Sequence, residues 1–333
     1  MKNAVVFGSS GFIGSHLVKR LRAEGWRVRG VDLRPPAGAD CSPDDFVLGD
    51  LKLPHVIEAA VEPGTEQLYQ LAADMGGAGY IFSGDHDADV MFNSGLINLH
   101  TAEIARRRQV GRMFFPSSAC IYPKHNQQDP GAPDCAEDTA YPADPDSEYG
   151  WEKLFAERLY LAYRRTRGLD VRIARLHNVY GPGNPWAGGR EKAPGALCRK
   201  VAQARDGGEM EIWGDGRQTR SFLYIDDCVD GVRALMQSDC PGPVNIGSQE
   251  LIAIDDFAQL IMRVAGKRLT LRHVPGPVGV RGRVSDNRLM ERIAGWQPRV
   301  SLEEGISRTY RWVAAQAEAR PREPDSVSSL SRA

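Results

Sequence analysis

The sequence predicts an α/β fold in which a doubly wound parallel sheet is joined to a smaller C-terminal domain. A short apolar run at residues 4–7 leads directly into glycines at positions 8, 11 and 14, and a helical pattern follows at residues 15–22. Patterns typical of strands and helices then alternate through the first half of the chain, as a parallel sheet with crossover helices requires. The expected strands lie at residues 27–31, 67–71, 113–116 and 170–176, and the expected long helices at residues 93–108 and 148–167.

The strand, glycine turn and helix at the start of the chain are typical of a Rossmann dinucleotide-binding motif. Gly8, Gly11 and Gly14 allow a tight turn, close approach of the backbone to a pyrophosphate, and close helix packing. Asp32 ends the second strand, where a carboxylate binds the adenosine ribose and would repel a 2′-phosphate; it favours NAD over NADP despite Arg34 nearby. The other expected cofactor contacts are Phe12, Ile13, Asp50, Leu71 and Ala72.

Composition excludes several classes of function. The 333 residues are 42% hydrophobic with a net charge of −1, so nothing points to nucleic acid. No apolar run approaches the roughly 20 residues that cross a bilayer. The six cysteines have no Cys-x-x-Cys spacing and no signal peptide precedes the first strand, so we expect a reduced, cytoplasmic protein with no metal site.

Tyr149 and Lys153 form a Tyr-x-x-x-Lys pair in the expected helix at residues 148–167. Side chains at i and i+4 share a helix face, where the ammonium can favour the phenolate and make Tyr a usable base. Such pairs also occur by chance on exposed helices, so the catalytic interpretation depends on the cofactor that the glycine turn predicts. Cys120 ends an apolar strand, where sites on parallel sheets open, although a free Cys is often only a small buried hydrophobe.

The sheet domain is expected to be discontinuous, because the strand and helix pattern stops after residue 180 and returns near residue 222. We assign residues 1–180 and 220–247 to the NAD-binding domain and residues 181–219 and 248–315 to the substrate-binding domain. Residues 316–333 lack periodicity and end in a Ser-rich stretch, so we expect a disordered tail.

Taken together, these features resemble the extended short-chain dehydrogenase/reductases that act on nucleotide sugars, and within them the GDP-mannose 3,5-epimerase family. The resemblance covers nearly the whole chain. The glycine turn and Tyr-x-x-x-Lys mark only the superfamily, whereas the segments around Cys120 and Lys192 mark the epimerases. The most specific segments are residues 71–77 (LAADMGG), 117–123 (SSACIYP), 188–194 (GGREKAP), 213–222 (WGDGRQTRSF) and 276–283 (GPVGVRGR).

The resemblance implies that GDP-D-mannose is converted to GDP-L-galactose, GDP-L-gulose or both. A ring C–H beside plain alcohols is too weak an acid for any side chain, so C4 must first be oxidised to a ketone that acidifies C3 and C5. Tyr149 would take the C4 hydroxyl proton while NAD+ takes the hydride, with Lys153 on the nicotinamide ribose and Ser118 bonding the same sugar oxygen. Cys120 would be the base and Lys192 the acid that invert C5, with C3 as a second expected position.

The expected substrate contacts form a loop over the hexose and a basic diphosphate site. Arg281 and Arg283 lie among glycines and prolines, which favours a diphosphate clamp with bidentate geometry for Arg281. Arg220 either binds substrate or pairs with Asp226 or Asp227. The full set is Met75, Gly76, Gly77, Ser118, Asn178, Glu191, Lys192, Lys200, Trp213, Gln218, Arg220 and Arg281.

Three other functions remain open. A GDP-L-fucose synthase-like epimerase/reductase shares the Cys120 segment through Lys124, but it uses NADPH and a His acid, against which Asp32 and Lys192 argue. A 4,6-dehydratase needs an Asp-Glu pair where Ala119 and Cys120 stand. A non-catalytic NAD-binding redox regulator would not need the intact set of catalytic side chains.

We also expect a homodimer, because two helices carry apolar faces suited to a two-fold helical interface. The residues proposed for that interface are Ala102, Ile104, Ala105, Leu154, Leu161 and Ala162.

Overall fold

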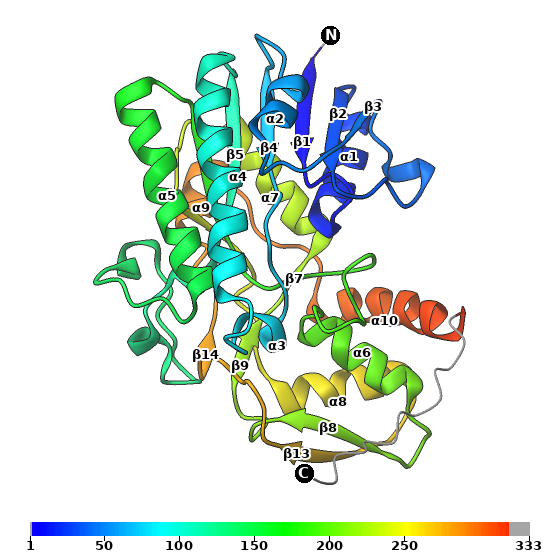
Figure 1. Ribbon diagram of the computed structural model, residues 1–333. Coiled ribbons are helices and arrows are strands. Elements are labelled where there is room, and N and C mark those ends of the chain that lie inside the picture. Colours follow the sequence, from blue (N-terminus) through cyan, green and yellow to red (C-terminus); the bar gives the residue numbers. More distant parts are fainter. Residues whose placement is uncertain (1, 320–333) are drawn as a thin grey trace, which may run out of the picture.

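The computed structural model describes residues 2–319, and its centre is a seven-stranded parallel sheet with the order β11-β6-β5-β4-β1-β2-β3 (Figure 1). The order reverses between β1 and β4, and ligands of doubly wound sheets bind at the carboxyl ends of the strands at such a point. The sheet confirms the predicted fold class. Its strands are β1 (Asn3–Phe7), β2 (Arg27–Asp32), β3 (Asp45–Leu48), β4 (Gln67–Gln70), β5 (Arg112–Ser118), β6 (Val171–Leu176) and β11 (Val244–Ile246).

Helices cover both faces of the sheet, so Ala4 to Phe7 of β1 are all buried, as a central parallel strand requires. One face carries α1 (Phe12–Ala23) and α7 (Ile225–Gln237), which pack against each other. The other carries α2 (Pro54–Ala60), α4 (Asp87–Arg107) and α5 (Glu148–Arg167). The two long helices α4 and α5 lie side by side in Figure 1.

Helix α5 has clear start and stop signals. The Ser147 hydroxyl accepts a hydrogen bond from the Gly150 N–H, and Gly168 closes the helix in the left-handed conformation at φ 71°. Three arginines in the last turn oppose the partial negative charge of the helix end. The helix therefore has the bounds that its sequence pattern predicts, and it presents Tyr149 and Lys153 from its first two turns.

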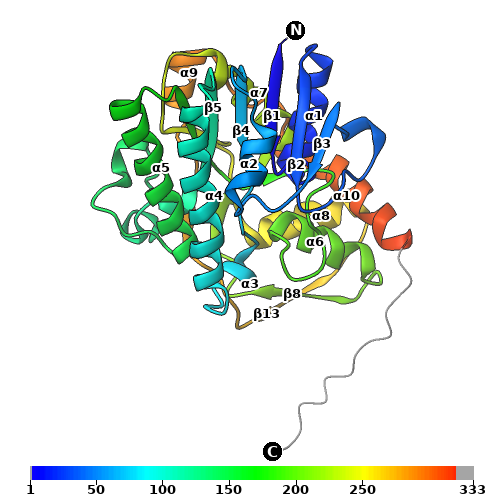
Figure 2. The same cartoon turned by 45° about the horizontal axis from the view of Figure 1, so that its top comes forward.

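A smaller unit lies beyond the carboxyl end of β1 in both views (Figures 1 and 2). Its helices α6 (Ala193–Gln203), α8 (Ile254–Ala265) and α10 (Leu302–Ala319) pack against one another. Its strands form a parallel pair, β8 (Glu209–Trp213) with β13 (Thr270–Val274), and a three-stranded sheet of β12 (Leu251–Ala253), β9 (Thr219–Ser221) and β14 (Gly282–Arg283). The remaining elements are α3 (Ala78–Ile81), α9 (Arg288–Ala294) and the short strands β7 (Val179–Tyr180) and β10 (Leu223–Tyr224).

The expected tail is partly wrong, because α10 continues through Ala319. Residues 316–319 are rich in Ala and Glu, which are strong helix formers, and they extend a helix whose apolar side is already anchored by the buried Ile306 and Val313. The rest of the expected tail, residues 320–333, lies outside the described residues.

The dimer interface proposed from the sequence is wrong for four of its six residues, while Leu161 and Ala162 are half-buried. Ala102, Ile104 and Ala105 are buried in the core between α4 and the sheet, and Leu154 packs in a small core cluster with Ile121. Apolar periodicity identifies a buried face, and here the protomer itself buries it. The apolar side chains that α4 and α5 leave exposed are Met91, Phe92, Leu99, Trp151 and Phe155.

Between residues 2 and 319, no helix combines the length and the apolar character needed to cross a bilayer. The same range contains no cluster of three or more His, Cys, Asp or Glu residues arranged to hold a metal ion.

Candidate active site

The glycine turn opens a crevice at the carboxyl ends of β1 and β4. Gly8 has φ 73°, and a Cβ there would meet the backbone of Leu71 and Ala72 at 3.0 Å. The cavity above the turn measures about 790 Å³. It is lined by all eleven residues that the sequence assigns to the cofactor: Gly8, Gly11, Phe12, Ile13, Gly14, Asp32, Asp50, Leu71, Ala72, Tyr149 and Lys153.

Backbone donors fix the Asp32 carboxylate at the rim of this crevice. One of its oxygens accepts the Ser10 N–H at 3.0 Å and the other accepts the Arg34 N–H at 3.2 Å. The carboxylate is therefore held in place, so its repulsion of a 2′-phosphate would not be relieved by rotation of the side chain. The crevice has both the close backbone approach and the ribose acceptor that fit NAD.

We expect the purified protein to carry NAD(H) and to bind NAD+ at least about tenfold more tightly than NADP+, roughly 1.4 kcal/mol, because Asp32 opposes the extra phosphate. Chromatography of the nucleotide released on denaturation and titration with both cofactors would measure this. In the Asp32→Ser variant the preference should shrink, whereas Asp40→Ser should leave it unchanged. Equal affinity of the wild type for the two cofactors would refute the assignment.

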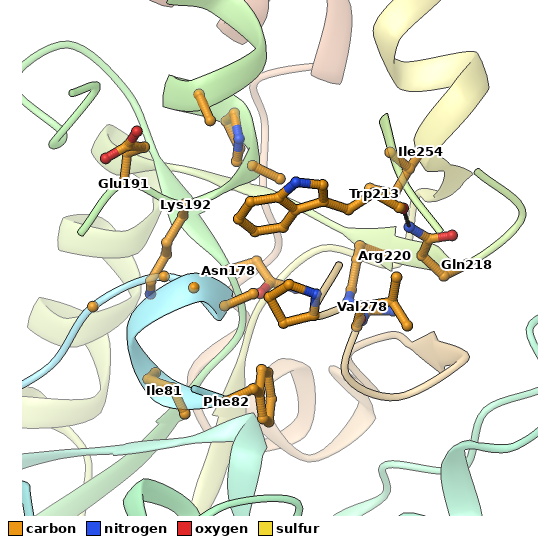
Figure 3. Close-up of a pocket in the computed structure, with 18 of the residues that line it drawn as sticks. Ile81, Phe82, Asn178, Glu191, Lys192, Trp213, Gln218, Arg220, Ile254 and Val278 are labelled. Carbon is orange, nitrogen blue, oxygen red and sulfur yellow. Dashed lines mark hydrogen bonds between the residues drawn. The ribbon is translucent and has the colours of Figure 1, made fainter. Parts of the chain in front are cut away.

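A second cavity of about 400 Å³ adjoins the crevice. Ser118, Tyr149, Asn178 and Lys192 line both cavities, so they lie where the two meet. Figure 3 shows Lys192 on one side of the second cavity and Arg220 on the other, with the Trp213 indole between them. Its lining includes Cys120 and all of the expected substrate contacts except Arg281: Met75, Gly76, Gly77, Ser118, Asn178, Glu191, Lys192, Lys200, Trp213, Gln218 and Arg220.

Cys120 is held against the start of α5 in a short 3-10 turn, Ala119–Ile121, that follows β5. Its N–H donates to the Ser118 hydroxyl at 3.2 Å. A Cβ at Gly150 would lie 2.3 Å from the Cys120 carbonyl oxygen, so only glycine lets the two backbones approach this closely. This packing brings the thiol of Cys120 and the phenol of Tyr149 to the same cavity.

Tyr149 and Lys153 are both buried, which shifts both groups toward their neutral forms. Burial raises the pKa of Tyr149, with the charges of Cys120 and Glu152 adding to it and the Ser118 hydroxyl opposing it. Burial lowers the pKa of Lys153, while Glu152 opposes that shift. The Lys153 ammonium lies 3.8 Å from Glu152 and 5.6 Å from the centre of the Tyr149 ring. In this arrangement burial outweighs the expected help of Lys153 to the phenolate.

Lys192 stands at the N-cap of α6 and lines the second cavity together with Cys120. Burial lowers its pKa, and the nearby thiol of Cys120 opposes that shift. Burial likewise raises the pKa of Cys120, with Asp146 adding to the rise and Arg283 and Lys192 opposing it. A lysine of lowered pKa is a better proton donor, and a thiolate of raised pKa is a stronger base.

The loop before α6 is tied to the loop that ends in α3. Gly77 N–H donates to the Arg190 carbonyl at 3.0 Å, and a Cβ at Gly77 would lie 2.0 Å from the Glu191 carbonyl oxygen. The Arg190 guanidinium pairs with Asp74 at 3.1 Å and stacks on the Tyr80 ring at 4.1 Å. The loop of Met75 to Gly77, which lines the second cavity, and the loop that carries Lys192 are therefore joined to each other.

The structure shows what three arginines that the sequence assigned to the substrate contact in the free protein. Arg220 pairs with neither Asp226 nor Asp227; its guanidinium donates to the carbonyls of Thr219 and Val278. Arg281 lies outside the cavity lining and makes a bidentate pair with Asp215 at 3.0 and 3.1 Å. Arg283 does line the cavity, and three of its five N–H donors bind Gln127, Cys120 and Asp146.

Sequence reasoning missed Arg283 as a contact of Cys120 and missed Asp146 altogether. Arg283 N–H donates to the Cys120 sulfur at 3.2 Å, and Asp146 pairs with the same guanidinium at 2.5 Å. The glycines around Arg283 indicate only a loop near a ligand, and nothing in the sequence pairs positions 120 and 283.

The fold and the two joined cavities, one built for a dinucleotide and one lined by Tyr149, Cys120 and Lys192, define a dehydrogenase-type enzyme of the extended short-chain class. The chain belongs to the NAD dependent epimerase/dehydratase family, which its residues 4–247 match. NAD as the predicted cofactor is thereby confirmed.

Known relatives agree with this assignment. The chain is 42% identical to the GDP-mannose 3,5-epimerase of Arabidopsis thaliana, over 97% of this chain and 85% of the relative. It is 29% identical to a putative GDP-L-fucose synthase 2 of Oryza sativa subsp. japonica, over 93% and 87%. The crystal structure of UDP-glucose 4-epimerase from Thermotoga maritima superimposes with a TM-score of 0.83 at 24% identity, covering 94% of this chain and 99% of that one, and shows the shared fold.

Proposed function

We propose that this protein is an NAD-dependent nucleotide-sugar epimerase that converts GDP-D-mannose to GDP-L-galactose, GDP-L-gulose or both. The observation that carries the proposal is that a thiol, Cys120, and an ammonium, Lys192, line one cavity beside Tyr149 at the mouth of the cofactor crevice. An epimerase that works through a ketone needs all three groups: one to help oxidise C4 and two to exchange a proton on opposite sides of a ring carbon. The 42% identity to the Arabidopsis GDP-mannose 3,5-epimerase supports GDP-mannose as the substrate.

Tyr149 would take the proton of the C4 hydroxyl, and Ser118, whose hydroxyl already interacts with Tyr149, would hold the same oxygen. NAD, when bound, supplies the acceptor and later the donor of the C4 hydride. Lys153 would hold the nicotinamide ribose from the floor of the crevice. With C4 as a ketone, the hydrogens at C3 and C5 become acidic.

Inversion then needs a base and an acid on opposite faces of the sugar. The Cys120 thiolate would take the ring proton and leave the electron pair in the enolate, and Lys192 would give a proton to the other face of the carbon. Cys120 ends as a thiol and Lys192 as a neutral amine, and exchange with solvent restores both. Their pKa shifts, up for the thiol and down for the ammonium, suit these roles.

We propose that the rest of the cavity holds the remainder of the substrate. Met75, Gly76 and Gly77 would cover the hexose. Diphosphate contacts would come from Asn178 and Arg220, with Arg281 joining only if it exchanges Asp215 for phosphate. Toward the nucleoside, the Lys200 ammonium lies 6.0 Å from the centre of the Trp213 ring, whose half-exposed face could stack on a base. The residues left for this end are Glu191, Lys200, Trp213 and Gln218.

The test is to incubate the protein with GDP-mannose and NAD+ in D2O, then locate deuterium and identify the hexoses by NMR. We expect deuterium at C5, with C3 labelled as well if both centres invert, and no net consumption of NAD+. An NADPH-consuming conversion of the keto sugar would instead support the GDP-L-fucose synthase-like alternative. No turnover and no exchange would leave a non-catalytic NAD-binding role and refute the proposal.

We further propose a homodimer that buries the exposed apolar side chains of α4 and α5. Phe92 is 64% exposed and Phe155 is 47% exposed, and both lie on the outer faces of these adjacent helices. Two copies related by a two-fold axis would pack these faces as four helices. A cytoplasmic location fits the six cysteines, all of which are unpaired thiols.

We expect sedimentation velocity at micromolar concentration to give twice the chain mass. The Phe155→Glu variant should sediment as a monomer, because it places a charge among the exposed apolar side chains that the dimer would bury. Leu48→Glu, which changes an exposed leucine on the opposite edge of the sheet, should remain dimeric. A monomeric wild type would contradict the proposal.

A further inference from the structure

Arg283 is a buried cation whose side chain is held by three different segments. It lies in β14, is 5% exposed, and comes from a part of the chain remote from the motifs around Cys120 and Tyr149. Its Nε donates to Gln127 Oε1 at 2.7 Å, one terminal nitrogen donates to Asp146 at 2.5 Å, and the other donates to the Cys120 sulfur at 3.2 Å.

Two of these contacts fix the direction of the third. The Gln127 amide is buried and gives its own N–H groups to the carbonyls of Tyr122 and Pro123, which leaves its oxygen toward Arg283. The Asp146 carboxylate is also buried and accepts the Ser147 hydroxyl at 2.8 Å. Because a guanidinium is planar and rigid, holding Nε and one terminal nitrogen fixes the plane of the group and directs an N–H of the other terminal nitrogen at the sulfur.

The charged and titratable groups around Cys120 have opposing effects on the ionisation of its thiol. Arg283, Lys192 and Arg220 favour a thiolate, whereas Asp146 and an ionised Tyr149 would oppose it. An N–H from a cation binds a thiolate more strongly than a neutral thiol, because the bond is then assisted by both charges. Arg283 is the member of this group that touches the sulfur.

We propose that Arg283 is a positioning residue that aims the Cys120 sulfur into the sugar cavity and stabilises it as a thiolate, and that Asp146 limits this effect by sharing the same guanidinium. The inference rests on the proposed function only in giving Cys120 the role of base. The contact itself is a property of the free protein. Each nitrogen of the guanidinium already donates to a protein group, which favours this role over the diphosphate clamp that the sequence suggested.

The test measures the ionisation of Cys120 directly in the full-length protein. The rate at which iodoacetamide alkylates Cys120, followed by peptide mass spectrometry between pH 6 and 11 because the pKa of this thiol is raised, reports the fraction of thiolate. We expect Arg283→Gln to raise the midpoint of this profile by about one pH unit or more, which slows alkylation at neutral pH about tenfold. We expect Asp146→Asn, which has nearly the same shape, to lower the midpoint.

Opposite shifts separate this role from a structural one. If the Arg283–Asp146 pair only held the fold together, both variants would lose thermal stability. The midpoint of the alkylation profile would then neither rise in Arg283→Gln nor fall in Asp146→Asn. Arg283→Lys, which restores a cation, should recover part of the shift, and Arg288→Gln, which removes an exposed arginine paired with Asp286, should cause none. Because Asp146→Asn keeps the shape of the pair, its result stands even if Arg283→Gln fails to fold.

Unchanged midpoints, or midpoints that move the same way in both variants, would overturn the inference. The proposed function is judged separately, by the wild type with GDP-mannose in D2O. A wild type that converts no GDP-mannose refutes that function, while the alkylation profiles alone decide the role of Arg283.

Discussion

Replacing Cys120 with Ala should stop solvent deuterium from entering the sugar while leaving oxidation of C4 intact. Tyr149, Lys153 and Ser118 remain in place, so GDP-mannose should still reduce bound NAD+ in a single turnover, measured by absorbance at 340 nm. The variant lacks the base that removes the ring proton, so exchange and product formation should fall roughly a thousandfold, as for loss of a general base. NMR in D2O would measure both.

Two further variants test whether the loss of exchange is specific to Cys120. Cys240→Ala, which removes a half-buried thiol outside both cavities, should exchange like the wild type. Lys192→Ala should lose inversion but keep some exchange at C5, because Cys120 can remove a proton and return a deuteron on the same face. If Cys120→Ala kept wild-type exchange, the thiol would be a packing residue and the site assignment would be wrong.

Replacing Tyr149 with Phe should abolish every step. Without the phenol no group takes the C4 hydroxyl proton, no ketone forms, and the hydrogens at C3 and C5 stay non-acidic. The 340 nm signal, deuterium exchange and product should all fall together, by on the order of a thousandfold or more. This pattern differs from that of Cys120→Ala, in which the 340 nm signal remains.

Tyr163→Phe is the matched control. It lies on the same helix, and its hydroxyl contacts Glu103 on α4, away from both cavities. It should retain hydride transfer and exchange. A Tyr149→Phe variant that still reduced NAD+ with GDP-mannose would show that another group serves as the base at C4.

The parts of the site that local sequence encodes were predictable. A turn that needs positive φ and close backbone approach requires glycine, which is why Gly8 and its neighbours identify the crevice. The spacing of Tyr149 and Lys153 follows from helix geometry alone. The spacing of residues did not identify the side chains of the second cavity. The resemblance to a family did, and Trp213 and Gln218, which it assigned to the substrate, line that cavity.

What could not be predicted depends on contacts between distant segments. Arg283 meets Cys120 across 163 positions of sequence, and Arg281, two residues earlier, turns instead to Asp215. Residues two apart in a strand point to the same face, so strand alternation does not separate this pair. Arg281 lies just before β14, and nothing in the sequence pattern says which of the two arginines meets the sulfur. The helix faces at Ala102 and Leu154 were misassigned for a similar reason, because periodicity does not reveal whether the chain or a second copy covers an apolar side.

The hydrogen bond between Gly77 and Arg190 has a consequence for the order of events during turnover. Moving the loop at Gly77 away from the cavity would break this bond or pull on the segment that ends in Lys192. If Lys192 is the acid, we expect it to deliver its proton only while this bond is intact. A keto sugar would be lost if it were released before re-reduction, so in the proposed reaction the same linkage would keep the intermediate enclosed until the acid has acted.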